Sequence, residues 1–160
     1  MNTPRTTYAV FLAGTFVWCG ALLLAPYLAA SASPFAVILY SFFHTICHQL
    51  PERSFHLFGE KLAVCARCAS IYFAFLFALL VYPLVRPVAN SVPLHRNILF
   101  LALLPMVVDV GLDFLGIHDS DFLTRTITGV ILGGTLPFVV LPVAVEGMQQ
   151  LLKPGTITEH

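Results

Sequence analysis

The residues of this sequence that could do chemistry are concentrated in one short stretch, residues 44–72. It holds three of the four cysteines, three of the six histidines and three of the eight basic side chains. Cys65 and Cys68 form a CxxC pair, a spacing at which two thiolates can bind one ion. Cys47 and a nearby histidine could complete a tetrahedron. We therefore predict a metal site with the ligands Cys47, His48, Cys65 and Cys68.

The choice of histidine is open at this stage. Adjacent helical residues point about 100° apart, so Cys47 and His48 can share an ion only if the helix unwinds there. The nearby Pro51 favours such unwinding. His44 would share a helix face with Cys47, and His56 in the following loop is a third candidate. Three thiolates and one imidazole suit Zn²⁺, which is the cofactor we expect.

The cysteines have three other interpretations. A CxxC at the start of a helix can be a redox pair, because the helix N-terminus and Arg67 both favour the thiolate. Two of the thiols could form a disulfide if the loop is extracytoplasmic, or they could be inert packed groups. We prefer metal binding for this cluster. Cys19 has only apolar neighbours in the sequence, and we interpret it as a small packed hydrophobe.

A second group of polar residues lies in an apolar segment near the C-terminal half. Asp109 and Asp113 are four residues apart and share one helix face. A charge at the bilayer centre costs from roughly 3 to above 10 kcal/mol, so it needs a partner or a use. We expect a polar pocket in which an aspartate is a general base, a ligand or a headgroup contact. The alternative is a set of ion pairs that joins helices. The candidate catalytic residues are Asp109, Asp113, Arg125, Arg53 and Arg67.

The elements that must position these groups are apolar helices. Of the 160 residues, 58% are hydrophobic and 10% are charged, and the mean hydropathy is +0.88. Soluble domains carry about 25% charged residues, so this composition predicts residence in the lipid bilayer. The net charge is zero, so nothing indicates a nucleic-acid partner.

We predict a single domain, residues 1–160, with an all-α fold: a polytopic transmembrane bundle of about five helices, the second short or re-entrant. The predicted helices cover residues 8–30, 35–49, 71–85, 97–117 and 122–152, with the CxxC opening the third. The spacing of Gly129 and Gly133 favours close helix packing. Pro137 and Pro142 should kink the last helix.

With five crossings, segment order alone brings the two polar groups to one end of the bundle. The fourth helix runs towards the cysteine-loop side as it passes Asp109, and the fifth starts from that side at Arg125. Basic residues then divide five to three, so the positive-inside rule predicts a cytoplasmic cysteine loop, an inside N-terminus and an outside C-terminus. A re-entrant second helix would invert the later spans. We expect a bacterial or archaeal cell membrane.

These residues resemble the signature of the small DUF2085 family of predicted membrane proteins. The resemblance covers about residues 40–135. The matching residues are Cys47-His48-Gln49, Pro51-Glu52-Arg53-Ser54-Phe55, Gly59, Val64-Cys65-Ala66-Arg67-Cys68, Ile71-Tyr72, Asp109, Asp113, Arg125 and Thr128-Gly129. The resemblance implies membrane residence and marks the same polar residues, but it implies no reaction.

The function we expect is that of a zinc-binding integral membrane protein. If it is an enzyme, metal-assisted hydrolysis or group transfer on a lipid-like or small-molecule substrate fits, with an aspartate as general base. Four protein ligands would indicate a structural site and three a catalytic one. The alternatives are a membrane thiol oxidoreductase that uses the CxxC, and an ion or proton transporter that uses Asp109 and Asp113.

Overall fold

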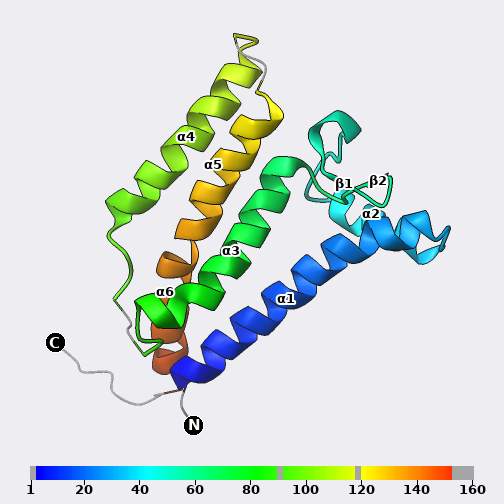
Figure 1. Ribbon diagram of the computed structural model, residues 1–160. Coiled ribbons are helices and arrows are strands. Elements are labelled where there is room, and N and C mark those ends of the chain that lie inside the picture. Colours follow the sequence, from blue (N-terminus) through cyan, green and yellow to red (C-terminus); the bar gives the residue numbers. More distant parts are fainter. Residues whose placement is uncertain (1–2, 90–91, 118–119, 153–160) are drawn as a thin grey trace.

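The computed structural model describes residues 3–89, 92–117 and 120–152, and these form an all-α bundle with one small hairpin (Figure 1). The predicted fold class is therefore confirmed. The elements, in order, are α1 (Thr3–Ala30), α2 (Phe35–His44), the 3-10 turn η1 (Pro51–Arg53), β1 (His56–Leu57), β2 (Glu60–Lys61), α3 (Ala66–Val85), α4 (Arg96–Phe114), α5 (Phe122–Thr135) and α6 (Pro137–Leu151).

Four helical stretches in the described part of the chain are long and apolar enough to cross a bilayer: α1, α3, α4, and α5 taken together with α6. Helix α2 has ten residues, about 15 Å of helix, which is half of the roughly 30 Å hydrocarbon core. The short second helix is thus confirmed. It ends at His44 instead of Gln49 and does not cross, so the count of five crossings is replaced by four.

With four crossings, the first and last helices begin and end at the same end of the bundle (Figure 1). Thr7 of α1 and Met148 of α6 line one cavity there. The expectation that the chain starts and finishes on opposite sides is therefore wrong, because it counted α2 as a span.

The distribution of basic residues also changes with four crossings. Among the described residues, four basic side chains lie at the cysteine end and three at the other, which favours neither orientation. The cytoplasmic cysteine loop remains a prediction. The cysteine end has Arg53, Lys61, Arg67 and Arg125. The other end has Arg5, Arg86 and Arg96.

Helices α3 and α5 pack backbone to backbone at two glycines. A Cβ atom on Gly129 would lie 2.7 Å from the carbonyl oxygen of Arg67, and one on Gly133 would lie 2.7 Å from the Cα atom of Ile71. Real Cβ atoms do not approach that closely, so only glycine allows this contact. The expected close approach at the small-residue spacing is confirmed.

The last predicted helix is divided at Pro137. Helix α5 ends at Thr135 and α6 begins at Pro137, because proline has no N–H to donate to the preceding turn and its ring collides with it. The break falls at the first of the two prolines for which a kink was predicted; the kink itself stays a prediction. Pro142 lies inside α6, which continues through it.

An aromatic cluster around Trp18 of α1 holds both α2 and α3 against α1. The Trp18 ring makes edge contacts with the rings of Phe42 and Phe43 of α2 and Tyr72 of α3, with centroids 5.7, 5.3 and 5.5 Å away. Such edge-to-face geometry is the favourable one for aromatic rings. Cys19 beside it is buried and donates its thiol to the Tyr72 carbonyl at 3.6 Å.

The segment between α2 and α3 is a buried support for the start of α3. Strands β1 and β2 pair through a tight turn at Phe58 and Gly59, which have φ values of 57° and 83°. The predicted turn at Gly59 is thus confirmed. Residues 62–64 follow the hairpin and are at most 3% exposed, because they pack into one core cluster with Leu22 of α1, Phe43 of α2 and Ala69 of α3.

We predict that Gly133→Ala destabilises the protein and that Gly134→Ala does not. Both changes add one methyl group to α5 and gain the same helix propensity. The Gly133 Cβ would collide with α3, whereas a Cβ on Gly134 meets nothing within 4 Å. Overpacking of this kind costs about 1–3 kcal/mol. Thermal unfolding of the purified proteins in detergent measures the difference, and equal melting temperatures for the two variants would contradict this packing.

Candidate metal centre

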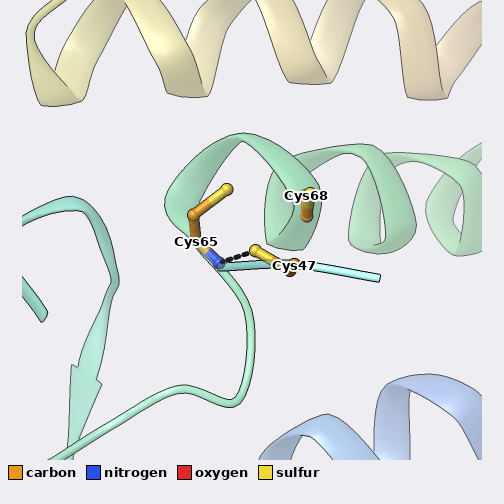
Figure 2. Close-up of side chains that lie close together, drawn as sticks. All are labelled: Cys47, Cys65 and Cys68. Carbon is orange, nitrogen blue, oxygen red and sulfur yellow. Dashed lines mark hydrogen bonds between the residues drawn. The ribbon is translucent and has the colours of Figure 1, made fainter. Parts of the chain in front are cut away.

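Three sulfur atoms gather where the loop after α2 meets the first turn of α3. The Sγ atoms of Cys47, Cys65 and Cys68 all lie within 4.8 Å of one another. Figure 2 shows the three side chains in this arrangement, with Cys47 approaching from outside the helix. Two segments that are far apart in the sequence therefore contribute to one cluster.

The start of α3 positions two of the sulfurs. Cys65 is the N-cap residue, with extended backbone angles of φ −68° and ψ 163°. Cys68 lies three residues later, so both side chains lie on one side of the first turn. The unpaired N–H groups at a helix start carry partial positive charge, which favours thiolates there.

Cys47 receives hydrogen bonds that suit a thiolate. Its sulfur accepts the backbone N–H of Cys65 at 3.1 Å (Figure 2) and also that of Gln49. Hydrogen bonds from the thiols of Cys65 and Cys68, followed by these backbone donors, hold the pKa of Cys47 well below its usual value. The Cys65 N–H thus stabilises a thiolate at Cys47, the form in which cysteine binds a metal ion.

Gln49 positions Cys47, and the sequence did not indicate it. Its backbone has a φ of 53°, a left-handed conformation that is unusual outside glycine. Its side chain donates to the Tyr40 carbonyl at 2.8 Å, and its own carbonyl accepts from the Lys61 ammonium at 2.7 Å. The Tyr40 hydroxyl donates to the Lys61 carbonyl. These contacts join α2 and β2 and stabilise the turn that follows Cys47.

The cluster fits a thiolate-bound metal ion. Tetrahedral bonds of about 2.3 Å to sulfur place two sulfurs about 3.8 Å apart. A spread of at most 4.8 Å is close enough for small side-chain rotations to reach that distance. The backbone N–H donors would remain in place around a bound ion.

The predicted histidine ligand is not part of this group. His48 lies next to Cys47 but is exposed, and His44 and His56 are exposed as well. The group of close ligand atoms contains the three sulfurs and none of these imidazoles. Binding of one ion by both Cys47 and His48 required the helix to unwind, and the chain does unwind after His44. However, in the turn at Gln49 Cys47 is buried, whereas His48 is exposed and lies outside the sulfur cluster.

Asp109 is held by a buried ion pair on the other side of α3. Its carboxylate accepts from the Arg67 guanidinium and from the Ser120 hydroxyl, the latter at 2.6 Å. The same guanidinium nitrogen donates to the Ser120 hydroxyl at 3.1 Å. The Asp109 residue is 8% exposed, so this pair joins α3 to α4 away from water.

Asp113 binds Arg53 and Arg125, the other two arginines predicted for the polar pocket. Its carboxylate lies 3.2 Å from a guanidinium nitrogen of Arg125 and 3.5 Å from one of Arg53. The backbone N–H of Ser120 donates to it at 3.3 Å, and Arg125 donates to the Ser120 carbonyl at 2.8 Å. We call Asp109, Asp113, Arg53, Arg67, Arg125 and Ser120 the ion-pair network.

The structure thus brings all five predicted polar residues together, and it adds Ser120. In the sequence, the one signal for Ser120 is its position directly before Asp121, the N-cap residue of α5. The Asp121 carboxylate caps this helix by accepting the Thr124 N–H at 2.7 Å. Both aspartates are fully engaged with arginine. Their arrangement favours ion pairs that join helices over a free general base.

Comparison with known proteins identifies the family of this chain. The chain is 36% identical over 152 residues to an uncharacterized protein of Methanocaldococcus jannaschii, covering 91% of this chain and 97% of that protein. It is 32% identical over 91 residues to an uncharacterized protein of Methanothermobacter thermautotrophicus, covering 57% and 80%. No solved structure matches it significantly. Residues 47–139, which include every cysteine and network residue discussed above except Cys19, match the family described as "Predicted membrane protein (DUF2085)". The chain belongs to this family of integral membrane proteins.

Proposed function

We propose that this integral membrane protein binds one zinc ion through the thiolates of Cys47, Cys65 and Cys68, at one end of its bundle. The observation that carries the proposal is the approach of three sulfurs, from two separate segments, to within 4.8 Å. A redox pair needs two sulfurs, whereas a metal site uses the third. Zinc accepts thiolate ligands and has no redox chemistry of its own.

Three protein sulfurs leave one tetrahedral position for another ligand. A closed four-ligand site is typical of structural zinc, and an open position is typical of catalytic zinc. The exposure of His48 supports the open form, in which the ion would supply Lewis acidity or an activated water. Hydrolysis or transfer on a lipid-like substrate is the reaction class that this form would support.

The ion-pair network has a supporting role in this proposal. Arg67 lies between Cys65 and Cys68 in the sequence, and its guanidinium binds Asp109 of α4. The network thereby holds the turn of α3 that carries both thiolates. The transporter alternative gains no support from the two cavities of about 540 and 510 Å³, which are lined almost entirely by apolar side chains.

A second candidate function is that of a membrane thiol oxidoreductase. The half-exposed Cys65 and Cys68 at the positive end of α3 favour it. The two functions differ in what the purified protein contains: zinc bound to reduced thiols, or a metal-free pair whose alkylation changes with the redox potential.

We predict that gently purified protein contains about one zinc per chain and that Cys47→Ser, Cys65→Ser and Cys68→Ser each lose it. Cys19→Ser is the matched control. It removes a buried cysteine whose sulfur bonds to the Tyr72 carbonyl outside the cluster, so its zinc content should equal that of the unaltered protein. Elemental analysis of the four variants measures this. Absence of any transition metal from the unaltered protein would remove the proposal, and redox-dependent alkylation would then establish the second candidate.

We predict that the fourth coordination position is open. Cobalt(II) exchanged into the site should give a thiolate charge-transfer band, and added cyanide should shift its visible bands. His48→Ala and the control His56→Ala should both leave the cobalt spectrum unchanged, since both imidazoles lie outside the group. A spectrum that changes only in His48→Ala, and resists cyanide, would establish His48 as the fourth ligand.

We predict that Asp109→Asn lowers the free energy of unfolding by about 3–5 kcal/mol, because it leaves the Arg67 charge buried without its counter-charge. Glu146→Gln removes an exposed carboxylate and is the control. The double change Asp109→Asn with Arg67→Gln should recover part of the loss. Denaturant unfolding in detergent measures all four proteins. Unaltered stability in Asp109→Asn, with loss of a metal-dependent activity, would instead support a general base.

A further inference from the structure

An apolar groove of about 540 Å³ runs along α3, on the side that faces α5 and α6. Phe77 and Val130 in its lining are 69% and 48% exposed, so the groove opens towards the bilayer. Its lining is apolar apart from Ser70. The lining residues used below are Phe55, Ser70, Phe77, Val81, Val130 and Phe138.

The length of the groove matches one leaflet of the membrane. From Ser70 to Val81 the helix rises about 17 Å at 1.5 Å per residue, and half of the hydrocarbon core is about 15 Å. The groove begins near the start of α3, at the end that carries the polar groups. It can therefore hold one acyl or isoprenoid chain, with the lipid headgroup at the network end.

The network end of the groove carries a partly exposed arginine. Phe55 lines the groove there and packs its ring on Phe122 at 4.6 Å, and Arg53 is two residues before it. The ion-pair network has three arginines for two aspartates, and Asp113 serves two of the three. The Arg53 side chain is 40% exposed and is the most exposed of the three.

Arg53 also has spare hydrogen-bonding capacity. It reaches Asp113 at 3.5 Å, while Arg125 lies closer to the same oxygen, at 3.2 Å. A guanidinium has five N–H donors in a planar fork that matches phosphate oxygens. In addition, the Nε atom of Arg67 is buried and has no hydrogen-bond partner within the described part of the chain. The donors of Arg53 are therefore open to an anionic group, whereas the Arg67 Nε atom lies inside the bundle.

We propose that this groove binds a bilayer lipid with an anionic phosphate headgroup, its chain between Ser70 and Val81 and its headgroup on Arg53. Lipid binding in this groove does not depend on the zinc ion proposed for the sulfur cluster. A phosphate at this position pairs with the Arg53 guanidinium, and a zwitterionic headgroup, whose own cation opposes Arg53, does so less well.

A second groove in the same molecule provides an internal comparison. It measures about 510 Å³, lies between α1 and α3, and is lined by Trp18 and Tyr72 among other apolar residues, with no lysine or arginine. Lipid chains should enter it without headgroup preference. Trp18 is the one tryptophan of the chain, so its fluorescence reports on this second groove.

Quenching by brominated lipids tests the proposal. In bilayers that contain brominated phosphatidylglycerol or brominated phosphatidylcholine, Trp18 of the unaltered protein reports on the second groove. The variant Trp18→Phe with Phe77→Trp reports on the first. We expect about fivefold preferential binding of the anionic lipid at position 77, as one arginine near a surface contributes about 1 kcal/mol, and none at position 18. The preference should disappear in Arg53→Gln and persist in Arg96→Gln, an exposed arginine at the opposite end.

Native mass spectrometry of the protein with Trp18 intact is the second measurement, because Trp18→Phe alters the aromatic cluster. The unaltered protein and Arg96→Gln should retain one phosphatidylglycerol at activation energies that strip it from Arg53→Gln. Equal quenching by both lipids at position 77, or retention of the lipid by Arg53→Gln, would overturn the proposal.

Discussion

The contact on which the rest of the structure depends is the backbone packing of α5 against α3. At Gly129 and Gly133 the two helices touch without intervening side chains, so that α5 lies directly against Arg67 and Ile71. Without hydrophobic driving force between helices in lipid, such close van der Waals packing is a main source of stability. It also brings the start of α5, with Arg125, to the level of the first turn of α3.

That first turn supports two different groups of side chains. Cys65 and Cys68 face the loop after α2, where Cys47 lies with its sulfur bonded to the Cys65 N–H. Arg67 faces Asp109 of α4 and Ser120 of the link before α5, and both bind it. The aromatic cluster around Trp18 holds the loop side in place, and the ion-pair network holds the α4 side. Both groups are therefore built on the same few residues of backbone.

Most of the architecture could be predicted from the sequence, because lipid leaves few choices. Long apolar runs must be helices when no water can bond their backbone, and the buried aspartates had to meet the arginines. The CxxC spacing and Cys47 indicated the sulfur cluster for the same reason: thiols and charges in an apolar chain need partners. The interruption at Pro137 followed from the missing N–H of proline.

The parts that could not be predicted depend on tertiary contacts. The left-handed turn at Gln49 is stabilised by Tyr40 and Lys61, and no local pattern indicates it. The turn follows the end of α2 at His44 and leaves the exposed His48 outside the cluster. Ser120 was missed because its hydroxyl and backbone matter only once α4 and α5 lie together.

The position of Arg67 between the two cysteines of α3 has a mechanical consequence. A helical turn moves as a unit. A rotation of α3 about its axis that moved the sulfurs of Cys65 and Cys68 away from Cys47 would therefore also draw the Arg67 guanidinium away from Asp109. The two groups share no side chain, but the rigid peptide units between them transmit such a displacement from one to the other. Each group therefore resists deformation of its neighbour on the opposite side of the helix.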